Sequence, residues 1–485
     1  MKVVTLHEFQ RRYLRSLQAE GLKLHPSELH RFFESINRVY GREHEVLSLK
    51  YDVSRGEYYI KTHGSVGFAY HLGDEPFMIQ ILPKPYRYDP DQRRSMKFFL
   101  SLLNMSGNLG MSPRDIELAI SAYGDEGELI HELFFYLYVF QLKRRVFHGM
   151  YQEYSELEES SKTIRGRVLL SRLIRTAPVG VDVPVRHSAL GVDNPLNRVL
   201  KAALEVVAEN SEWRGIGRAA GSLIEYFRGV GTLDQKDPER VSFNSLNERF
   251  KPVYTLATII LTGFSRKTGT NSGQQGVFID MAHLFEDLAY HTIKRALNGK
   301  GVVYRNYTLP HIVKDHGRVE AKLGAVFTLG SPLPDILVVT DSGKCAIEVK
   351  YRGLIVKMGG NWWRKLVRSS EDLYQIYSYS RLAGGSAAIV YPRLKGAYNH
   401  WIPDMFEPSG ELLSFFDGTP FALFGYELSR VGTDVFITRN GVVLRDSIAR
   451  NLRETLLALC EKREAGNSRH GAGLKSLEQM SQQRD

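Results

Sequence analysis

The chain has 485 residues, too many for one hydrophobic core, so we expect roughly three domains. Its formal net charge of +10 permits a polyanionic partner but does not require one, because many soluble proteins are equally basic. Two cysteines exclude a disulfide framework and a four-cysteine zinc site, and no apolar run reaches the ~18 residues of a membrane span. The N-terminus lacks the apolar core of a signal peptide, so we expect a cytoplasmic protein without membrane contact.

The first half of the chain divides into three parts by its residue patterns. Residues 1–44 are charged and carry apolar residues at helical spacing, which predicts a helical N-terminal extension. Over 45–125, short alternating strands separated by glycines, followed by helical segments, predict a β-rich module with trailing helices. Residues 126–266 are predicted to be mainly helical, around one long segment that is apolar on nearly every side. Within this region, 164–170 and 181–186 resemble strands separated by a basic turn.

The second half of the chain predicts an α/β core. A helix, a strand at 302–304, a hairpin, a second helix and a strand at 387–391 together describe a mixed sheet with helices. We place this core at 277–395, with a C-terminal α/β addition at 396–462 and a disordered tail at 463–485. The predicted fold class is therefore multidomain, α+β and α/β, with a β-rich N-terminal module, a helical middle region and a C-terminal α/β core.

The hairpin is the stretch that carries the candidate chemistry. Two apolar strands, 334–340 and 345–350, are joined by a polar turn with a glycine, which is typical of a β-hairpin. Because side chains alternate along a strand, Glu348 and Lys350 share one face, and Asp335 can reach the same end of the hairpin. Two carboxylates and an ammonium would be costly inside a core unless a metal or a water needs them. This arrangement predicts a Mg²⁺-dependent phosphodiesterase.

Each residue of the hairpin can be given a role in that chemistry. Phosphodiester hydrolysis needs an activated water and neutralisation of charge on the phosphate, and Mg²⁺ provides both through oxygen ligands. Asp335 and Glu348 are the candidate ligands, with the Val349 carbonyl as a third and Glu286, on the preceding helix, as an extra carboxylate. Lys350 would orient the water or stabilise the developing negative charge. The alternative is a surface hairpin with ordinary charges, because this short pattern also occurs by chance.

The helix and the loop that follow the hairpin add further candidates. Gln375 and Tyr379 lie four residues apart on one helix face, where they could orient catalytic groups or contact the cleaved strand; core packing is the alternative for the helix's tyrosines. The loop before this helix mixes cations with tryptophans, which suits phosphate contact and base stacking, although a solvated basic loop over packed tryptophans explains it equally well. The candidate DNA contacts in this loop are Arg352, Lys357, Trp363, Arg364 and Lys365.

Several other kinds of site are missing from the sequence. No G-x-x-x-x-G-K-[ST] motif occurs, so the chain does not bind a nucleotide through a P-loop. His283 and His291 have no cysteines at zinc-binding spacing, and no serine or cysteine has the context of a catalytic triad.

The order of the motifs resembles that of the PD-(D/E)xK nucleases and, more specifically, of the McrC family, the nuclease subunits of McrBC modification-dependent restriction systems. The resemblance covers roughly residues 45–395, and its upstream motifs are more specific than the nuclease residues, which many nucleases share. The matching segments are Pro83-Lys84, Ile164-Arg165-Gly166-Arg167, Asp193-Asn194-x-x-Asn197-Arg198, Leu284-Phe285-Glu286, and the hairpin followed by Gln375-x-x-x-Tyr379.

The resemblance implies a subunit that neither recognises modified DNA nor hydrolyses nucleotide by itself. In the family, an AAA+ GTPase (McrB) forms hexameric rings, recognises modified double-stranded DNA and translocates. The N-terminal β-module of McrC docks in the ring and stimulates GTP hydrolysis, which assigns Lys84 to partner docking here. This chain has Glu348 where related McrC chains often have Asp, and either carboxylate can ligate Mg²⁺.

We therefore predict a Mg²⁺-dependent DNA endonuclease subunit of a GTP-driven restriction complex. One alternative keeps the nuclease but places it, as a RecB-like subunit, in a DNA repair or recombination assembly. The other is a non-catalytic protein whose role is to activate an AAA+ ring.

Overall fold

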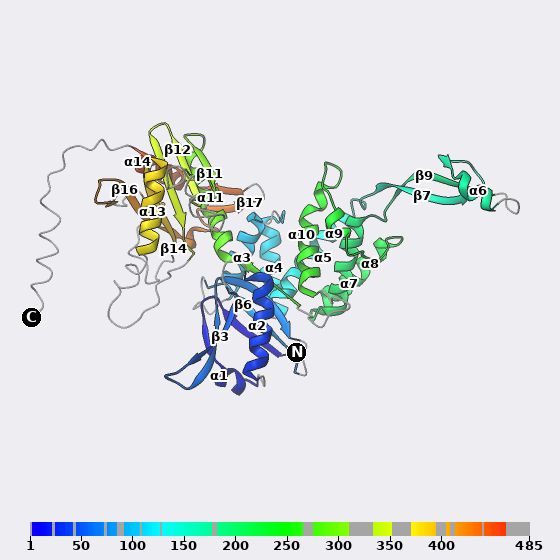
Figure 1. The fold of residues 1–485 in the computed structure, drawn as a ribbon, viewed down its shortest axis with the longest axis horizontal. Coiled ribbons are helices and arrows are strands. Elements are labelled where there is room, and N and C mark those ends of the chain that lie inside the picture. Colours follow the sequence, from blue (N-terminus) through cyan, green and yellow to red (C-terminus); the bar gives the residue numbers. More distant parts are fainter. Residues whose placement is uncertain are drawn as a thin grey trace, which may run out of the picture. The chain divides into compact units, whose positions relative to one another are not determined.

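The protein has a mixed α+β architecture of two compact units, Met1–Met281 and Ala282–Asp485 (Figure 1). None of the described helices is long and apolar enough to cross a membrane. The predicted combination of helices and sheets in several units is confirmed. The computed structural model describes residues 2–21, 25–41, 45–71, 75–84, 92–106, 109–126, 129–176, 182–264, 275–309, 333–351, 370–393, 404–407, 413–438 and 441–461.

A four-stranded sheet forms the base of the first unit, in the order β1-β6-β5-β10. β1 runs parallel to β6, whereas β5 is antiparallel to both β6 and β10. The strands are β1 (Lys2–His7), β5 (Ser65–His71), β6 (Phe77–Leu82) and β10 (Gln275–Asp280).

Two strands of this sheet correct the prediction from sequence. The extension 1–44 is not purely helical, because β1 lies within it; its buried Val4 and Leu6 alternate with more exposed residues, as in a strand. β10 follows a segment rich in glycine and serine and pairs with β5, more than 200 residues earlier in the chain. The core predicted to begin at 277 therefore starts too early, because β10 belongs to the sheet of the first unit.

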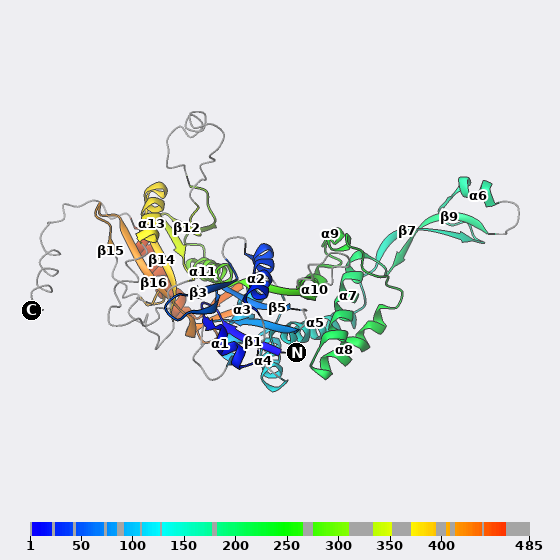
Figure 2. The same cartoon turned by 60° about the horizontal axis from the view of Figure 1, so that its bottom comes forward.

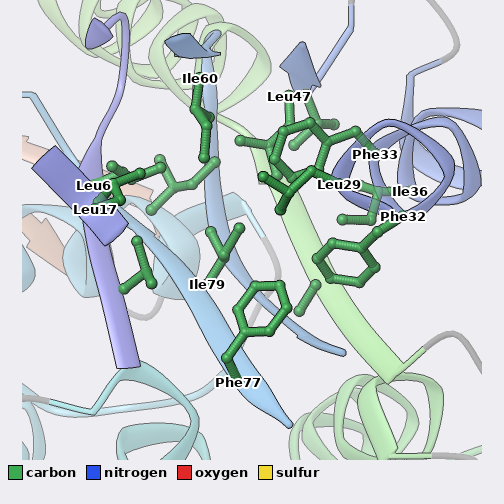
Figure 3. Close-up of a cluster of buried hydrophobic side chains, with 14 of the residues drawn as sticks. Leu6, Leu17, Leu29, Phe32, Phe33, Ile36, Leu47, Ile60, Phe77 and Ile79 are labelled. Atoms are coloured by element: carbon green, nitrogen blue, oxygen red, sulfur yellow. The ribbon is translucent and has the colours of Figure 1, made fainter. Parts of the chain in front are cut away.

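A three-stranded antiparallel sheet, β2-β4-β3, packs against helix α2 in the same unit. The α2 helix begins with a capping box between His25 and Glu28, and its buried apolar residues repeat at helical spacing. Figure 3 shows this core, in which Phe33 and Leu29 of α2 meet Leu47 and Ile60 of the sheet. The elements are β2 (Arg11–Tyr13), α1 (Leu14–Ala19), α2 (Pro26–Tyr40), β3 (Leu47–Asp52) and β4 (Glu57–Thr62).

Helices form the middle of the first unit, as predicted. The central helix is α5, which is buried along most of its length. It contacts α4, α8 and α10, and this packing against several helices explains why apolar residues occur all around α5. The helices are α3 (Gln92–Ser106), α4 (Pro113–Glu126), α5 (Ile130–Val146), α7 (Pro195–Asn210), α8 (Arg214–Ile224), α9 (Asp237–Arg240) and α10 (Lys251–Phe264), with 3-10 turns at Glu225–Phe227 and Glu248–Phe250.

A β-arm interrupts these helices between α5 and α7. Figures 1 and 2 show its long strands β7 and β9 paired side by side, with α6 beside them. The amide nitrogens of Asn194 and Asn197 donate to the Tyr151 and Val192 carbonyls, which joins the segment before β7 to the segment after β9 at the base of the arm. The sequence analysis did not predict β7. It predicted a strand at 164–170, where the structure has only the short β8. The elements are β7 (Glu153–Ser161), β8 (Arg167–Val168), α6 (Leu170–Thr176) and β9 (Val183–Gly191).

The second unit is built on a six-stranded mixed sheet in the order β11-β12-β13-β14-β16-β15. β11, β12 and β13 are antiparallel, and β13, β14 and β16 are parallel. β16 is the direct neighbour of β14, so the boundary predicted at 395 divides one sheet and is wrong. The strands are β11 (Val302–Arg305), β12 (Ile336–Thr340), β13 (Gly343–Val349), β14 (Ser386–Arg393), β15 (Leu413–Ser414) and β16 (Pro420–Glu427).

Helices pack against this sheet in the second unit. α13 packs against β13 and β14, with Ile376 and Tyr379 among buried residues that include Leu337 and Ala346. α14 contacts β12, β13, β14 and β16, and Arg453 in α14 donates to the Ala296 carbonyl of α11. The remaining elements are α11 (Met281–Leu297), α13 (Ser370–Ala383), a 3-10 turn at Leu428–Arg430, the hairpin β17 (Val435–Thr438) and β18 (Gly441–Leu444), and α14 (Asp446–Cys460). The predicted tail 463–485 lies outside the described residues.

The core between α2 and the small sheet generates the first prediction. Phe33 is 2% exposed within this core, so Phe33→Ala should lower the free energy of unfolding by about 3–5 kcal/mol through reduced burial and a cavity. Urea unfolding followed by tyrosine fluorescence would measure the change. Val53→Ala is the matched control, because Val53 is 86% exposed in the same unit. Equal stability of the two variants would contradict this packing.

Candidate active site

The hairpin forms as the sequence predicts. β12 and β13 pair antiparallel, with Ile336 opposite Ile347, and a short turn at 341–342 joins them. Their apolar residues are buried on both faces of the sheet, which explains why the pattern is nearly continuous. Asp335 stands immediately before β12 and Glu348 near the end of β13, so both acids lie at the same end of the hairpin.

Six of the predicted site residues meet at this end. Lys350 Nζ donates to Glu348 Oε1 and lies 3.4 Å from Gln375 Oε1. The amide nitrogen of Gln375 donates in turn to the Tyr379 hydroxyl over 2.8 Å. Asp335 Oδ2 accepts a 2.7 Å hydrogen bond from the Val349 backbone N–H, which ties the two strand ends together. The chain Glu348–Lys350–Gln375–Tyr379 thus links the hairpin to α13.

Burial raises the pKa values of both acids, and the charge of Asp335 raises that of Glu348 further. Glu348 is only 3% exposed, and its Oε2 atom has no hydrogen-bond partner among the described residues. Burial, and next the charge of Asp335, raise the pKa of Glu348 to about 7, while Lys350 opposes the shift. Burial also raises the pKa of Asp335, against the Val349 N–H and the Lys350 charge. Among the described residues, only Glu348 of the two acids forms an ion pair, with Lys350, and a divalent cation would offset the negative charge that remains.

The residues present fit a Mg²⁺ ion. The uncoordinated Glu348 Oε2 and the second oxygen of Asp335 are hard oxygen donors, the type that Mg²⁺ prefers. Extending the hairpin register brings Pro334 opposite Val349, and proline has no N–H with which to occupy the Val349 carbonyl. Within the described ranges, no group of three His, Cys, Asp or Glu side chains is suited to a metal. Two carboxylates and a carbonyl are therefore the oxygen donors that the described residues could offer such an ion, and waters would have to complete its shell.

The other predicted site residues have different outcomes. Glu286 lies half-buried on α11, and since no three-acid group forms among the described residues, its role as a ligand stays a prediction. The predicted DNA contacts Arg352, Lys357, Trp363, Arg364 and Lys365 all lie outside the described residues.

Lys84, the predicted docking residue, lies in the first unit. It is half-buried, and its Nζ lies 4.5 Å from the centroid of the Phe9 ring. Its backbone N–H donates to Glu8 Oε2 over 2.8 Å. Burial lowers the pKa of Lys84 to about 8, and the Glu8 carboxylate opposes this shift. Its role in docking stays a prediction.

Three further charged residues, which the sequence analysis missed, act on the acids. Asp372 on α13 is 2% exposed, and its charge adds to burial in raising the pKa of Glu348. Arg305 and His283 lower the pKa of Asp335 against the effect of burial. Asp372 precedes Gln375 by three residues, a helical spacing that could have revealed it. Arg305 and His283 come from separate elements, and no spacing in the sequence connects them to the hairpin.

The second unit is thus an α/β fold whose mixed sheet carries two acids and a lysine at one hairpin end. The family model described as "McrBC 5-methylcytosine restriction system component" matches residues 60–392, and the chain belongs to this family as an McrC-like subunit. No curated protein matches the chain.

Two solved structures from Thermococcus gammatolerans resemble the chain. One is a chain of the refined half-complex from a tetradecameric assembly of McrB AAA+ hexamers with bound McrC. It is 24% identical with a TM-score of 0.63, and the match covers 94% of this chain and 99% of that chain. The other belongs to the cryo-EM structure of the McrBC complex, with 25% identity, a TM-score of 0.44, and coverage of 63% of this chain and 90% of that chain. The first likeness shows that the overall fold is shared.

The raised pKa of Glu348 predicts a dependence of stability on pH in metal-free buffer. Between its ordinary value of 4.5 and about 7, folding takes up a proton, so the free energy of unfolding falls as pH rises through this window. Glu348→Gln removes the penalty and should gain up to about 3 kcal/mol over the unchanged protein at about pH 8, but not at about pH 4. Chemical denaturation in EDTA at both pH values measures the difference. Glu371→Gln, an exposed site on α13, is the control, and a gain independent of pH would refute the assignment.

Proposed function

We propose that this chain is the Mg²⁺-dependent DNA endonuclease subunit of a GTP-driven McrBC-like complex, with a PD-(D/E)xK core in its second unit. The observation that carries the proposal is the buried Glu348 oxygen without a partner, beside Asp335 and the Lys350 ammonium. Most buried polar atoms have a hydrogen-bond partner, so an unpartnered carboxylate oxygen next to a second buried acid suits a ligand for a hard cation.

The chain's own residues divide the work of hydrolysis. Mg²⁺, when bound by Asp335, Glu348 and the Val349 carbonyl, would supply Lewis-acid stabilisation of the phosphate and a more acidic water. Lys350 lies beside Glu348 and would present its remaining N–H donor to the attacking water or to a phosphate oxygen. Gln375 holds the Lys350 ammonium from α13, and the Tyr379 hydroxyl holds the Gln375 amide in turn. These two residues position the lysine without needing to react.

A McrB-like AAA+ GTPase is the proposed partner. The related half-complex holds McrB AAA+ hexamers with bound McrC, and the sequence of this chain has no P-loop of its own. With this partner, the chain would stimulate GTP hydrolysis by the AAA+ protein, and the complex would cut modified double-stranded DNA. Membership of a restriction-system family favours this role over a RecB-like repair nuclease. A non-catalytic activator remains the rival to be tested.

Loss of Lys350 separates the nuclease from the activator. Lys350→Ala should lower the rate of DNA cleavage by about 10²–10³, because one charge-stabilising group is removed. It should leave stimulation of the partner's GTPase intact, since the family resemblance assigns stimulation to the N-terminal β-module and Lys350 belongs to the second unit. Cleavage of 5-methylcytosine plasmid with partner, GTP and Mg²⁺ measures the first, and phosphate release the second. Lys344→Ala, exposed at the opposite end of β13, is the control. Undiminished cutting by Lys350→Ala would leave only the activator.

Mg²⁺ binding is testable without any cleavage. A magnesium concentration 100-fold above the dissociation constant should stabilise the protein by about 2.7 kcal/mol, because the ion binds only the folded acids. Asp335→Asn should abolish this gain, since one of the two carboxylate ligands is removed. Thermal unfolding with and without Mg²⁺, followed by circular dichroism, gives both values. Equal stabilisation of Asp335→Asn would place any magnesium elsewhere.

A further inference from the structure

The chain has two cysteines, and the second unit brings their elements together. Cys345 lies in β13, and Cys460 is the last residue of α14, much later in the chain. α14 packs against β12 and β13, so the helix and the strand are direct neighbours. Both side chains are free thiols, and the exposed fraction is 0% for Cys345 and 2% for Cys460. Neither thiol has a role in the candidate active site.

The strand and the helix direct these two side chains towards each other. Ala346 packs in a buried cluster with Ile376 of α13, so its neighbour Cys345 points to the opposite face of the sheet. In α14, Cys460 continues a row of buried residues spaced four apart, which is the side of a helix that faces a core. The row is Ile448, Leu452, Leu456 and Cys460. Both cysteines therefore lie in the contact between α14 and the sheet.

The two sulfur atoms lie within hydrogen-bond reach of each other. The Cys345 thiol donates to the Cys460 sulfur, and the Thr340 hydroxyl, at the end of β12, is a second neighbour of that sulfur. The hydrogen bond from Cys345 lowers the pKa of Cys460, against the effect of burial. Burial, and next the Cys460 thiol, raise the pKa of Cys345. Cys460 is therefore the more acidic thiol, and the thiolate is the form that attacks a disulfide.

The positions of the two thiols in their elements give them different access to solvent. Cys460 occupies the last position of α14, and helix ends open locally at little cost in free energy. Cys345 lies within the sheet, opposite Val338 of β12 and Ser386 of β14, and stays covered while the sheet is intact. A reagent in solution can therefore meet Cys460 first, and Cys345 can react only with a group that α14 carries back to it.

We infer that Cys345 and Cys460 form a redox-sensitive pair, which closes a disulfide between β13 and α14 when a small-molecule disulfide such as oxidised glutathione is abundant. Ordinary packing explains a single buried cysteine, because cysteine behaves as a small apolar residue. It does not explain why the two thiols of a 485-residue chain meet, with the more acidic one at a helix end. The inference is independent of the proposed nuclease function.

The reaction is two successive exchanges of thiol and disulfide. The Cys460 thiolate attacks one sulfur of glutathione disulfide, whose S–S bond breaks, and the departing glutathione thiolate takes up a proton. The Cys345 thiol then loses its proton to solvent and attacks the Cys460 sulfur, which releases the second glutathione as a thiol. The two protein thiols are oxidised to one disulfide, and one glutathione disulfide is reduced to two thiols.

The link would fasten the end of α14 to the hairpin. Thr340 beside Cys460 marks the turn end of the hairpin, whereas Asp335 and Glu348 lie at the other end, so the link leaves the acids in place. A disulfide that closes a long loop stabilises a protein mainly by restricting its unfolded chain. Oxidation should therefore stabilise the second unit.

The test incubates the full chain in EDTA with a series of ratios of oxidised to reduced glutathione. Peptide mapping by mass spectrometry without reductant should find Cys345 linked to Cys460 within one chain. The melting temperature, followed by circular dichroism, should rise by roughly 5–15 °C on oxidation and return when dithiothreitol is added. Cys460→Ser is the matched control, because it keeps Cys345 but cannot close the link. Cys345→Ser is a second control, in case the first variant folds poorly.

The outcomes decide the inference in either direction. A cross-link within one chain, absent from both serine variants, supports it. Glutathione that stays attached to Cys460 without a cross-link would overturn it, because Cys345 would then not reach the mixed disulfide. Cross-links between chains would also overturn it, as would thiols that stay reduced at every ratio in the folded protein.

Discussion

The proximity of two buried acids at one hairpin end is the constraint on which the second unit depends. Asp335 and Glu348 repel each other and lose solvation, so the neighbouring structure must hold them in place. The Val349 N–H binds one acid and Lys350 the other. The Lys350 backbone N–H donates to the Val390 carbonyl of β14 over 2.9 Å, so the parallel half of the sheet anchors the end of the hairpin. The whole sheet therefore stabilises a local arrangement that is unfavourable alone.

Without metal, protonation of Glu348 can reduce the negative charge of the site. A Glu348 carboxyl with a pKa of about 7 is partly protonated beside the lysine, so the cluster can lower its net negative charge around neutral pH. Binding of a divalent cation by Asp335 and Glu348 would favour the ionised form of both carboxylates. The lysine would then be available to the reacting phosphate. On the proposed function, the two carboxylates would then hold the ion while Lys350 faces the phosphate.

The sequence predicted those features that local patterns encode. The hairpin is two apolar runs around a glycine turn, and Gln375 and Tyr379 are joined by helical spacing, so both were visible without a structure. β1 and β10 could not be found in this way, because each becomes a strand only through partners far along the chain. The largely exposed, charged β7 lacks the apolar alternation that marks a strand and depends on its register with β9. Long-range pairing, rather than local propensity, decided these cases.

The positions of the charged residues say more about DNA binding than the net charge of the chain does. The acids at the hairpin end repel the polyanion that, on the proposed function, they would help to cleave, and this repulsion persists until a metal is bound. Affinity for DNA must therefore come from other surfaces. Exposed cations act over about 10 Å at moderate salt and cost little desolvation, so they can supply this affinity without lying among the acids. Binding and chemistry thus make opposite demands on charge, because each needs the sign of charge that the other must avoid.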